Sequence, residues 1–196
     1  MPFERIDDRL EFDRNCHLFR LDGRLIPSIT QAMLSAGLID TTWFSEYARD
    51  RGSAIHLATA YFDLGVLDAD YLDGAQAGYL EAWDLCCREH GCRWVEGGIE
   101  QIVYSVPLQL AGIIDRNGFW EGDPAVVEIK TGELLLSAGI QLQLQSEMLP
   151  PGSRRRIAVR LYENGRYEWK EFKDREDRKV AMSCLTITHW KRRNKK

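Results

Sequence analysis

The sequence predicts a mixed α/β protein of the α+β kind, with a central mixed sheet flanked by helices. Two observations support this prediction. Apolar residues recur at helical spacing through most of the first half, and they give way near residue 99 to alternating and short apolar runs typical of strands. The composition, with 44% hydrophobic, 29% charged and 10% aromatic residues in a chain of 196, is that of a folded globular protein.

The chain is expected to begin with a hairpin followed by a short helix. Alternating runs flank Asp22-Gly23, a dipeptide that accepts positive φ, and predict a hairpin over residues 16–26. Ser28 and Gln31 have the spacing of a capping box, so a helix should begin there and end at Gly37.

The elements that follow are predicted from the same signals. They are, in order, helices over 42–64 and 71–90, strands over 99–106, 108–116 and 125–130, a helix over 137–149, strands over 156–162 and 166–172, and a helix over 174–190. Turns are expected at Asn117-Gly118, at 122–124 and at Asn164-Gly165. Pro150-Pro151 should end the helix over 137–149.

A single domain of residues 1–196 is expected, because no linker, repeat or low-complexity segment divides the chain. Its parts are an N-terminal hairpin and helix (1–40), a core (41–172), and a C-terminal helix with a basic tail (173–196). Charge is unevenly spread, because residues 1–150 hold 11 Lys/Arg against 24 Asp/Glu, whereas residues 151–196 hold 15 against 6. The basic segment favours a polyanionic partner such as nucleic acid, or serves solubility.

The sequence predicts a cytoplasmic protein without a membrane partner. The N-terminus (MPFERIDDRLEF) is acidic where a secretory signal would be basic and then apolar, and no run of about 18 apolar residues occurs. The cysteines are therefore expected to be reduced thiols. They are Cys16, Cys86, Cys87, Cys92 and Cys184.

Two short strings have the residue types of a metal-dependent hydrolase. They are Gly112-Ile113-Ile114-Asp115 and Val126-Val127-Glu128-Ile129-Lys130-Thr131-Gly132. On a strand, Glu128 and Lys130 share a face, and Asp115, expected at the end of the preceding strand, would return beside Glu128. Two carboxylates suit Mg²⁺ or Mn²⁺, and an adjacent amine suits phosphodiester hydrolysis. Alternatively, the Glu/Lys pair lies on an edge strand and faces solvent.

Five motifs in order resemble the PD-(D/E)xK nuclease superfamily, and most closely its RecB-like exonuclease branch, which includes small phage and prophage members. They are the R-G-x-x-x-H string from Arg51 to His56, the isolated Glu100, G-I-I-D, V-E-I-K-T-G and a glutamine-rich helix. The resemblance spans about residues 26–172. It implies a restriction-endonuclease-like core in a bacterial or phage-infected cell.

The resemblance also implies roles for individual residues. Asp115, Glu128 and the backbone carbonyl of Ile129 would be metal ligands, and Lys130 would position or activate the attacking water. His56 would add a ligand from its helix, although a histidine at this position also fits a simple hydrogen-bonded helix residue. Glu100 would face the metal or a residue that supports it, or lie on the surface of its strand.

The helix after the catalytic strand carries Q-x-x-x-Y in the family, and here the pattern departs from it. Gln141 lies at the expected distance after Lys130, but Gln145 stands where the family has tyrosine, which keeps a hydrogen-bond donor and removes a stacking ring. The alternative register pairs Gln143 with Glu147. The three alternating glutamines cannot all face one way on a helix, so Gln143 is expected to be peripheral.

The expected cofactor is Mg²⁺ or Mn²⁺. An iron–sulfur cluster is not expected, because related nucleases that hold one have three cysteines after the glutamine motif and this chain has only Cys184. Cys86, Cys87, Cys92 and His90 form a nominal zinc set, but adjacent cysteines on an apolar helical stripe are more typical of a core, so no zinc is assigned.

The function predicted from these features is divalent-metal-dependent DNA hydrolysis by an exonuclease of DNA recombination, repair or phage DNA processing. DNA is the expected partner, with a recombination or replication protein as a further one. The residues expected to contact the DNA backbone are Arg51, Arg154, Arg155, Arg156, Lys191, Arg192 and Arg193. The alternatives are a nuclease-like module that binds DNA or protein without cutting, and a hydrolase of other substrates or a scaffold.

Overall fold

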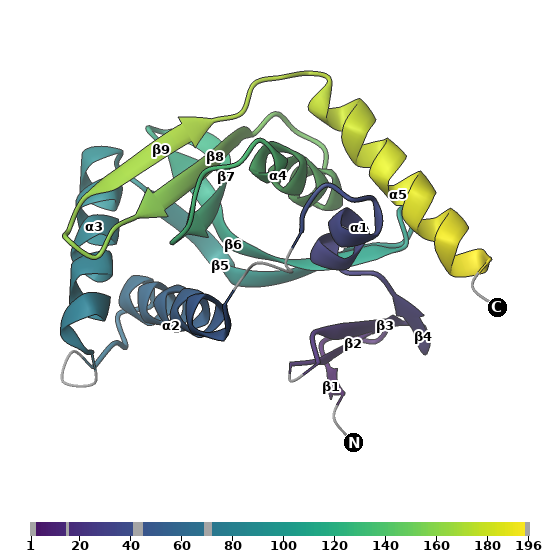
Figure 1. The fold of residues 1–196 in the computed structure, drawn as a ribbon, viewed down its shortest axis with the longest axis horizontal. Coiled ribbons are helices and arrows are strands. Elements are labelled where there is room, and N and C mark those ends of the chain that lie inside the picture. The colour runs from purple at the N-terminus through teal and green to yellow at the C-terminus, as the bar shows by residue number, and fades with distance from the viewer. Residues whose placement is uncertain (1–2, 15, 41–44, 69–71, 195–196) are drawn as a thin grey trace.

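The computed structural model describes residues 3–14, 16–40, 45–68 and 72–194. These residues form an α+β fold with two sheets and five helices (Figure 1). In chain order the elements are β1 (Glu4–Arg5), β2 (Leu10–Asp13), β3 (Leu18–Leu21), β4 (Arg24–Ile26), α1 (Ile29–Ser35), α2 (Glu46–Asp63), α3 (Gly74–Glu89), β5 (Arg93–Ser105), β6 (Leu110–Trp120), β7 (Asp123–Lys130), α4 (Ser137–Met148), β8 (Arg155–Leu161), β9 (Tyr167–Glu171) and α5 (Asp177–Arg193).

The first sheet is an antiparallel meander of β1 to β4, which we call the N-terminal sheet. The predicted hairpin is confirmed as β3 and β4, and Asp22 and Gly23 take φ of 50° and 74° at its turn. Strands β1 and β2 were not predicted. Apolar residues of β2 and β3 pack against Ala111 of β6, so the N-terminal sheet rests on the second sheet.

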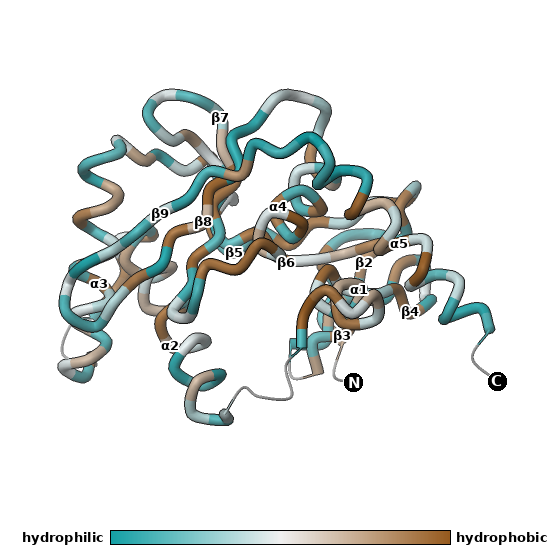
Figure 2. The backbone as a smooth tube through the Cα atoms, turned by 45° about the horizontal axis from the view of Figure 1, so that its top comes forward, coloured by the Kyte–Doolittle hydropathy of each residue, from teal (hydrophilic) through white to brown (hydrophobic). Residues whose placement is uncertain are grey.

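The second sheet has the order β5-β6-β7-β8-β9. The predicted meander is confirmed as antiparallel β5, β6 and β7, and β8 then pairs in parallel with β7. Helix α4 connects β7 to β8 and packs with α1 and α5 on one face, whereas α2 and α3 cover the other (Figure 1). Figure 2 shows hydrophobic stretches along the central strands, whereas β9 and the end of α5 are hydrophilic.

The turn predicted at Asn117-Gly118 is wrong, because β6 continues through both residues to Trp120. A Cβ atom at Gly118 would lie 2.0 Å from the backbone oxygen of Arg93, so glycine is needed there for the close approach of β5. The chain instead turns at Glu121 and Gly122, whose φ values are 53° and 87°.

Strand β5 begins at Arg93, well before the predicted start at residue 99, and it contains an irregularity. Its register with β6 shifts between Trp94 and Ile99, where Gly97 has a φ of 67°, and Glu100, directly after this stretch, has a φ of 48°. Such bulges bend a strand and redirect its side chains. The irregularity therefore sets the direction of Glu100.

The predicted capping signal of the first helix is confirmed, and two further N-caps were not predicted. Ser28 and Gln31 form the expected capping box of α1, and Asp73 and Gln76 form a second one at α3. Helix α2 begins after the N-cap Ser45, and its predicted residues 42–44 lie outside the described residues, as does residue 71 of the next predicted helix. Within the described ranges, every helix is too short or too polar to cross a membrane.

Candidate metal centre

Three side chains from three elements converge beside the second sheet. Helix α2 supplies His56, β5 supplies Glu100 and β6 supplies Asp115, and their potential ligand atoms all lie within 4.8 Å of one another. The His56 Nδ1 atom is 3.4 Å from Asp115 Oδ1 and 3.9 Å from Glu100 Oε1. Ligands at right angles around a divalent ion, with bonds of about 2.1 Å, are about 3 Å apart. One imidazole and two carboxylates at this spacing fit Mn²⁺ or Mg²⁺.

The Asp115 carboxylate lies where the ladder between β6 and β7 ends. The last paired residues are Arg116 and Val127, and beyond them the Ile129 N–H donates to Asp115 Oδ2 at 2.7 Å in place of a backbone oxygen. Oδ1 of the same carboxylate faces His56. The prediction that Asp115 ends its strand is wrong, because β6 continues to Trp120, but the predicted return of the chain beside Asp115 is confirmed.

Glu128 is buried and holds the lysine of its motif. Its Oε1 accepts from Lys130 Nζ at 2.7 Å and from Gln141 Nε2 at 2.6 Å, and its Oε2 accepts from Gln145 Nε2 at 2.7 Å. Glu128 is 3% exposed, so the alternative of a solvent-facing pair is excluded. Both oxygens accept hydrogen bonds from protein donors, and among the described residues Glu100 lies in one cluster with His56 and Asp115. The role of Glu128 as a metal ligand stays a prediction.

The two glutamines Gln141 and Gln145 share one face of α4 and both donate to Glu128, as the first of the two registers predicted. Gln141 also accepts from Lys130 Nζ at 3.0 Å. Gln143 points elsewhere and donates to Glu147, which confirms its peripheral position. The Oε1 atom of the fully buried Gln145 has no hydrogen-bond partner among the described residues.

Arg116 supports the centre and was not predicted. Its fully buried guanidinium donates to Asp63 Oδ2 at 2.6 Å, to Glu100 Oε1 at 3.2 Å and to the Asp115 backbone oxygen at 2.6 Å. It also donates to Thr59 Oγ1 and lies over the Trp83 ring. Arg116 therefore joins α2, β5 and β6. In the sequence, this role is indicated only by the position of Arg116 directly after Asp115.

The charges of the centre depend on one another. Burial opposes a proton on His56, but the carboxylates of Asp115 and Glu100 raise its pKa to about 10. Burial would raise the pKa of Asp115, yet His56, Lys130 and the Ile129 N–H hold it below its ordinary value. Burial and the charge of Asp115 raise the pKa of Glu128. Glu128 and Asp115 in turn overcome burial and raise the pKa of Lys130.

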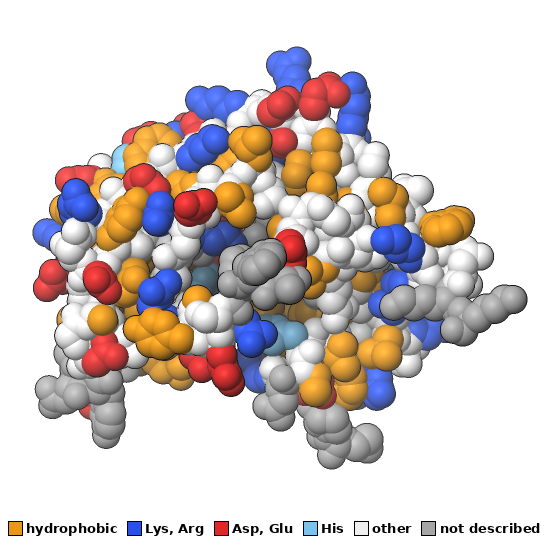
Figure 3. All heavy atoms as spheres, in the orientation of Figure 1, with side chains coloured by type: hydrophobic (Ala, Val, Ile, Leu, Met, Phe, Trp, Pro, Cys, Tyr) orange, Lys and Arg blue, Asp and Glu red, His pale blue; other side chains and the backbone are white. Residues whose placement is uncertain are grey.

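A cleft of about 1030 Å³ opens at the centre, between the N-terminal sheet and α2. Its wall includes His56, Glu100, Asp115 and Gln141. The opposite side is built from β2 and β3, and α1 contributes its first turn. Figure 3 shows the hollow in the middle of this face of the molecule.

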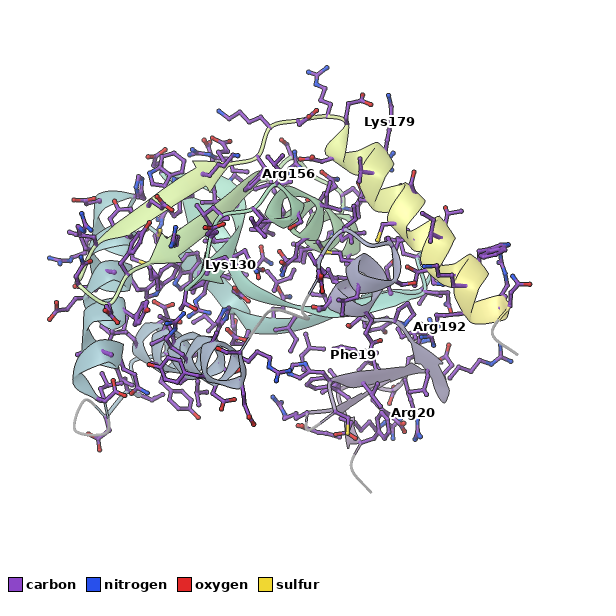
Figure 4. All side chains as sticks on the ribbon, viewed as in Figure 1. Phe19, Arg20, Lys130, Arg156, Lys179 and Arg192 are labelled. Atoms are coloured by element: carbon purple, nitrogen blue, oxygen red, sulfur yellow. The ribbon has the colours of Figure 1, made fainter. Side chains whose placement is uncertain are left out.

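Two arginines expected to contact DNA are part of the fold instead. Arg156 is 8% exposed, and it pairs with Asp177 at 2.8 Å and donates to the backbone oxygens of Gly139 and Asp174 (Figure 4). Arg155 pairs with Glu121 at 2.8 Å and also with Glu171. Each guanidinium makes three hydrogen bonds within the fold, and the two side chains are only 18% and 9% exposed, so we leave both out of the proposed DNA surface.

The remaining predicted basic residues have mixed surroundings. Arg51 lies over the Tyr47 ring at 5.8 Å, and Arg154 donates to Pro150 O. Three others lie in the last turn of α5. Lys191 donates to Ser35 O, Arg192 donates to Leu25 O of β4 (Figure 4), and Arg193 is exposed. Lys191 and Arg192 thus attach the end of α5 to the N-terminal elements.

No protein-family model matches the chain, and the search of curated proteins gave no significant match. The fold and the site together define an α+β protein with a candidate divalent-metal centre in a cleft.

Proposed function

We propose that this protein is a divalent-metal-dependent nuclease that hydrolyses phosphodiester bonds in DNA. One observation carries the proposal: His56, Glu100 and Asp115 converge beside a half-buried lysine that Glu128 and Gln141 hold in place. The order of the motifs, which resembles RecB-like nucleases with a PD-(D/E)xK core, supports the same function. An exonuclease is the form that this resemblance favours.

The chain supplies binding, orientation and charge to this reaction. His56, Glu100 and Asp115 would hold Mg²⁺ or Mn²⁺, which when bound stabilises negative charge on the phosphate and lowers the pKa of a water. Lys130 carries its proton at neutral pH, so its ammonium group orients the attacking water and faces the phosphate charge. The water attacks phosphorus and releases one proton to solvent as the new P–O bond forms. The bond to the leaving oxygen breaks, and that oxygen takes up a proton from solvent. Arg116 holds Glu100 in position.

The test is degradation of linear and circular DNA by the purified protein with Mg²⁺, with Mn²⁺ and with a chelator. Metal-dependent loss of DNA that Asp115→Asn abolishes is expected. Loss of the linear form alone would identify an exonuclease, and loss of both forms an endonuclease. If the intact protein cleaves neither form with either metal, the proposal is wrong.

A second candidate is a nuclease-like module that binds DNA without cutting it. The observation that favours it is the engagement of both Glu128 oxygens by Lys130, Gln141 and Gln145, because these hydrogen bonds compete with coordination of a metal by this carboxylate. Binding of DNA that is unchanged by a chelator, together with no cleavage, would identify this function.

A further inference from the structure

An apolar stripe of α2 lies exposed beside the candidate metal centre. Leu57, Tyr61 and Leu64 are 51%, 43% and 57% exposed, and all three line the cleft together with His56. Their spacing of four and then three residues places them on one side of the helix. Exposed apolar side chains grouped in this way mark a binding surface.

The N-terminal sheet forms the wall opposite this stripe. Phe12 and Phe19 stack with ring centroids 4.4 Å apart, and His17 meets Phe12 edge-on. Figure 4 shows Phe19 on the side of β3 that faces the rest of the molecule, whereas Arg20 points away. Residues Phe12, His17 and Phe19 all line the cleft, but Phe12 and Phe19 are each only 1% exposed, so His17 is the exposed ring of these three.

The charges of the cleft do not suit a duplex. Among the described residues that line it, Arg14 is the one Lys or Arg, and it pairs with Glu4 at 2.8 Å. Glu100 and Asp115 lie in the same lining. Binding of duplex DNA depends on many contacts from Lys and Arg to phosphates. Unpaired strands also use such contacts, but they gain further affinity from bases stacked on aromatic side chains, and the exposed ring of Tyr61 offers a surface for stacking.

We propose that the cleft binds an unpaired DNA strand, with its bases against Leu57, Tyr61 and Leu64 and a phosphate at the metal centre. The inference rests on the proposed nuclease function and names its substrate class. From residue 57 to 64 a helix rises about 10 Å, which matches about three nucleotides of a stacked strand. The cleft volume of about 1030 Å³ lies at the upper end of small-molecule pockets, as a short stretch of strand requires.

The experiment measures binding of a fluorescent unpaired oligonucleotide and of its blunt duplex, by anisotropy in a chelator so that no cleavage occurs. The unpaired strand is expected to bind at least about tenfold more tightly. Tyr61→Ala should weaken binding of the unpaired strand by about 5- to 100-fold, because a stacking surface is removed. Tyr61→Phe, which keeps the ring, should bind as the natural protein does.

The matched control is Tyr47→Ala, a second exposed tyrosine of α2 that lies outside the cleft lining and should leave binding unchanged. Thermal melts show whether each variant is folded. Equal affinity for unpaired strand and duplex, or equal losses for Tyr61→Ala and Tyr47→Ala, overturns the inference. If the protein still cleaves duplex DNA with Mn²⁺, the proposed nuclease function is retained although the inference about the unpaired strand is wrong. If the unpaired strand binds as expected but no DNA is cleaved, the nuclease function is wrong and the binding result is unaffected.

Discussion

Lys130 and Asp115 are expected to have separable roles. Lys130→Ala should lower DNA cleavage by about 10²- to 10⁴-fold and leave Mn²⁺ affinity near its original value, because the amine contacts Glu128 and Gln141. Asp115→Ala should lose both, since this carboxylate lies in the three-residue cluster. Calorimetry with Mn²⁺ and a cleavage assay on the same samples measure the two effects.

The control for this pair is Gln143→Ala, whose amide donates to Glu147 on the periphery of α4. It should change neither metal binding nor cleavage. Equal loss of Mn²⁺ binding in Lys130→Ala and Asp115→Ala would contradict the separation of roles.

Substitutions of Glu100 and Arg116 should also have separable effects. A change at Glu100 should lower metal affinity, and a change at Arg116 should lower stability. Arg116→Gln leaves Asp63 in the interior without its ion pair, which costs about 3–5 kcal/mol in free energy of unfolding. Glu100→Gln alters a side chain that is 35% exposed, so the protein should remain stable while Mn²⁺ affinity falls. Urea denaturation and calorimetry test the two. A Glu100→Gln protein that binds Mn²⁺ normally would remove Glu100 from the ligand set.

Local spacing predicted part of this site. The shared face of Glu128 and Lys130 follows from the strand period, and the shared face of Gln141 and Gln145 from the helix period. The contacts of Arg116 with Asp63 and Glu100 join segments far apart in sequence, and no local period encodes them. Glu100 also depends on a strand irregularity that only the pairing of β5 with β6 creates.

At the scale of elements, the approach of β5 to β6 makes Gly118 irreplaceable. Gly118→Ala would place a Cβ atom 2.0 Å from the Arg93 oxygen, so the strands must separate, at a cost of about 2 kcal/mol or more in stability. Gly74→Ala is the control, because nothing lies near its added Cβ atom at the start of α3. It should stabilise by about 0.4–1 kcal/mol.

Urea denaturation of both glycine variants measures the change in free energy of unfolding that each substitution causes. If Gly118→Ala is as stable as Gly74→Ala, the close approach of the two strands is not as described.

Elements that depend on local patterns were predicted from the sequence, and elements that depend on contacts between distant segments were not. The capping box at Ser28 is a local hydrogen-bond pattern, so the sequence predicts the helix that it begins, and the helix after Asp73 is predicted from its apolar spacing. Asn117-Gly118 has the sequence of a turn. A glycine inside a strand that allows a neighbouring strand to approach closely cannot be distinguished from a turn glycine by sequence alone. Strands β1 and β2 are short and largely polar, and they produced no signal.

At the scale of the whole molecule, part of the basic excess of residues 151–196 is paired with acidic side chains in the described residues. Arg155 pairs with Glu121, Arg156 with Asp177, and Arg178 with Glu147. Two of these three acidic partners belong to the acidic first 150 residues. The charge asymmetry of the sequence therefore serves in part to attach the C-terminal segment to the rest of the fold.

Arg156 and Arg193 should consequently respond in opposite ways. Arg156→Gln should lower the free energy of unfolding by about 3 kcal/mol, because Asp177 loses its partner, and it should leave the salt dependence of DNA binding unchanged. Arg193→Gln should leave stability unchanged and flatten the plot of log affinity against log salt by about 0.7 for a single strand. Denaturation and salt titrations measure both. A flatter slope in Arg156→Gln would return this residue to the DNA surface.

The parallel pairing of β7 with β8 has a consequence for the growing chain. His56, Glu100, Asp115 and Lys130 are all synthesised before β8, yet β7 keeps an open apolar edge until Arg155–Leu161 arrive to cover it. Open edges of this kind recruit other chains. A polypeptide released after α4 would thus contain every proposed ligand but would aggregate before it could bind a metal. Formation of the centre therefore depends on β8, which contributes no ligand to it.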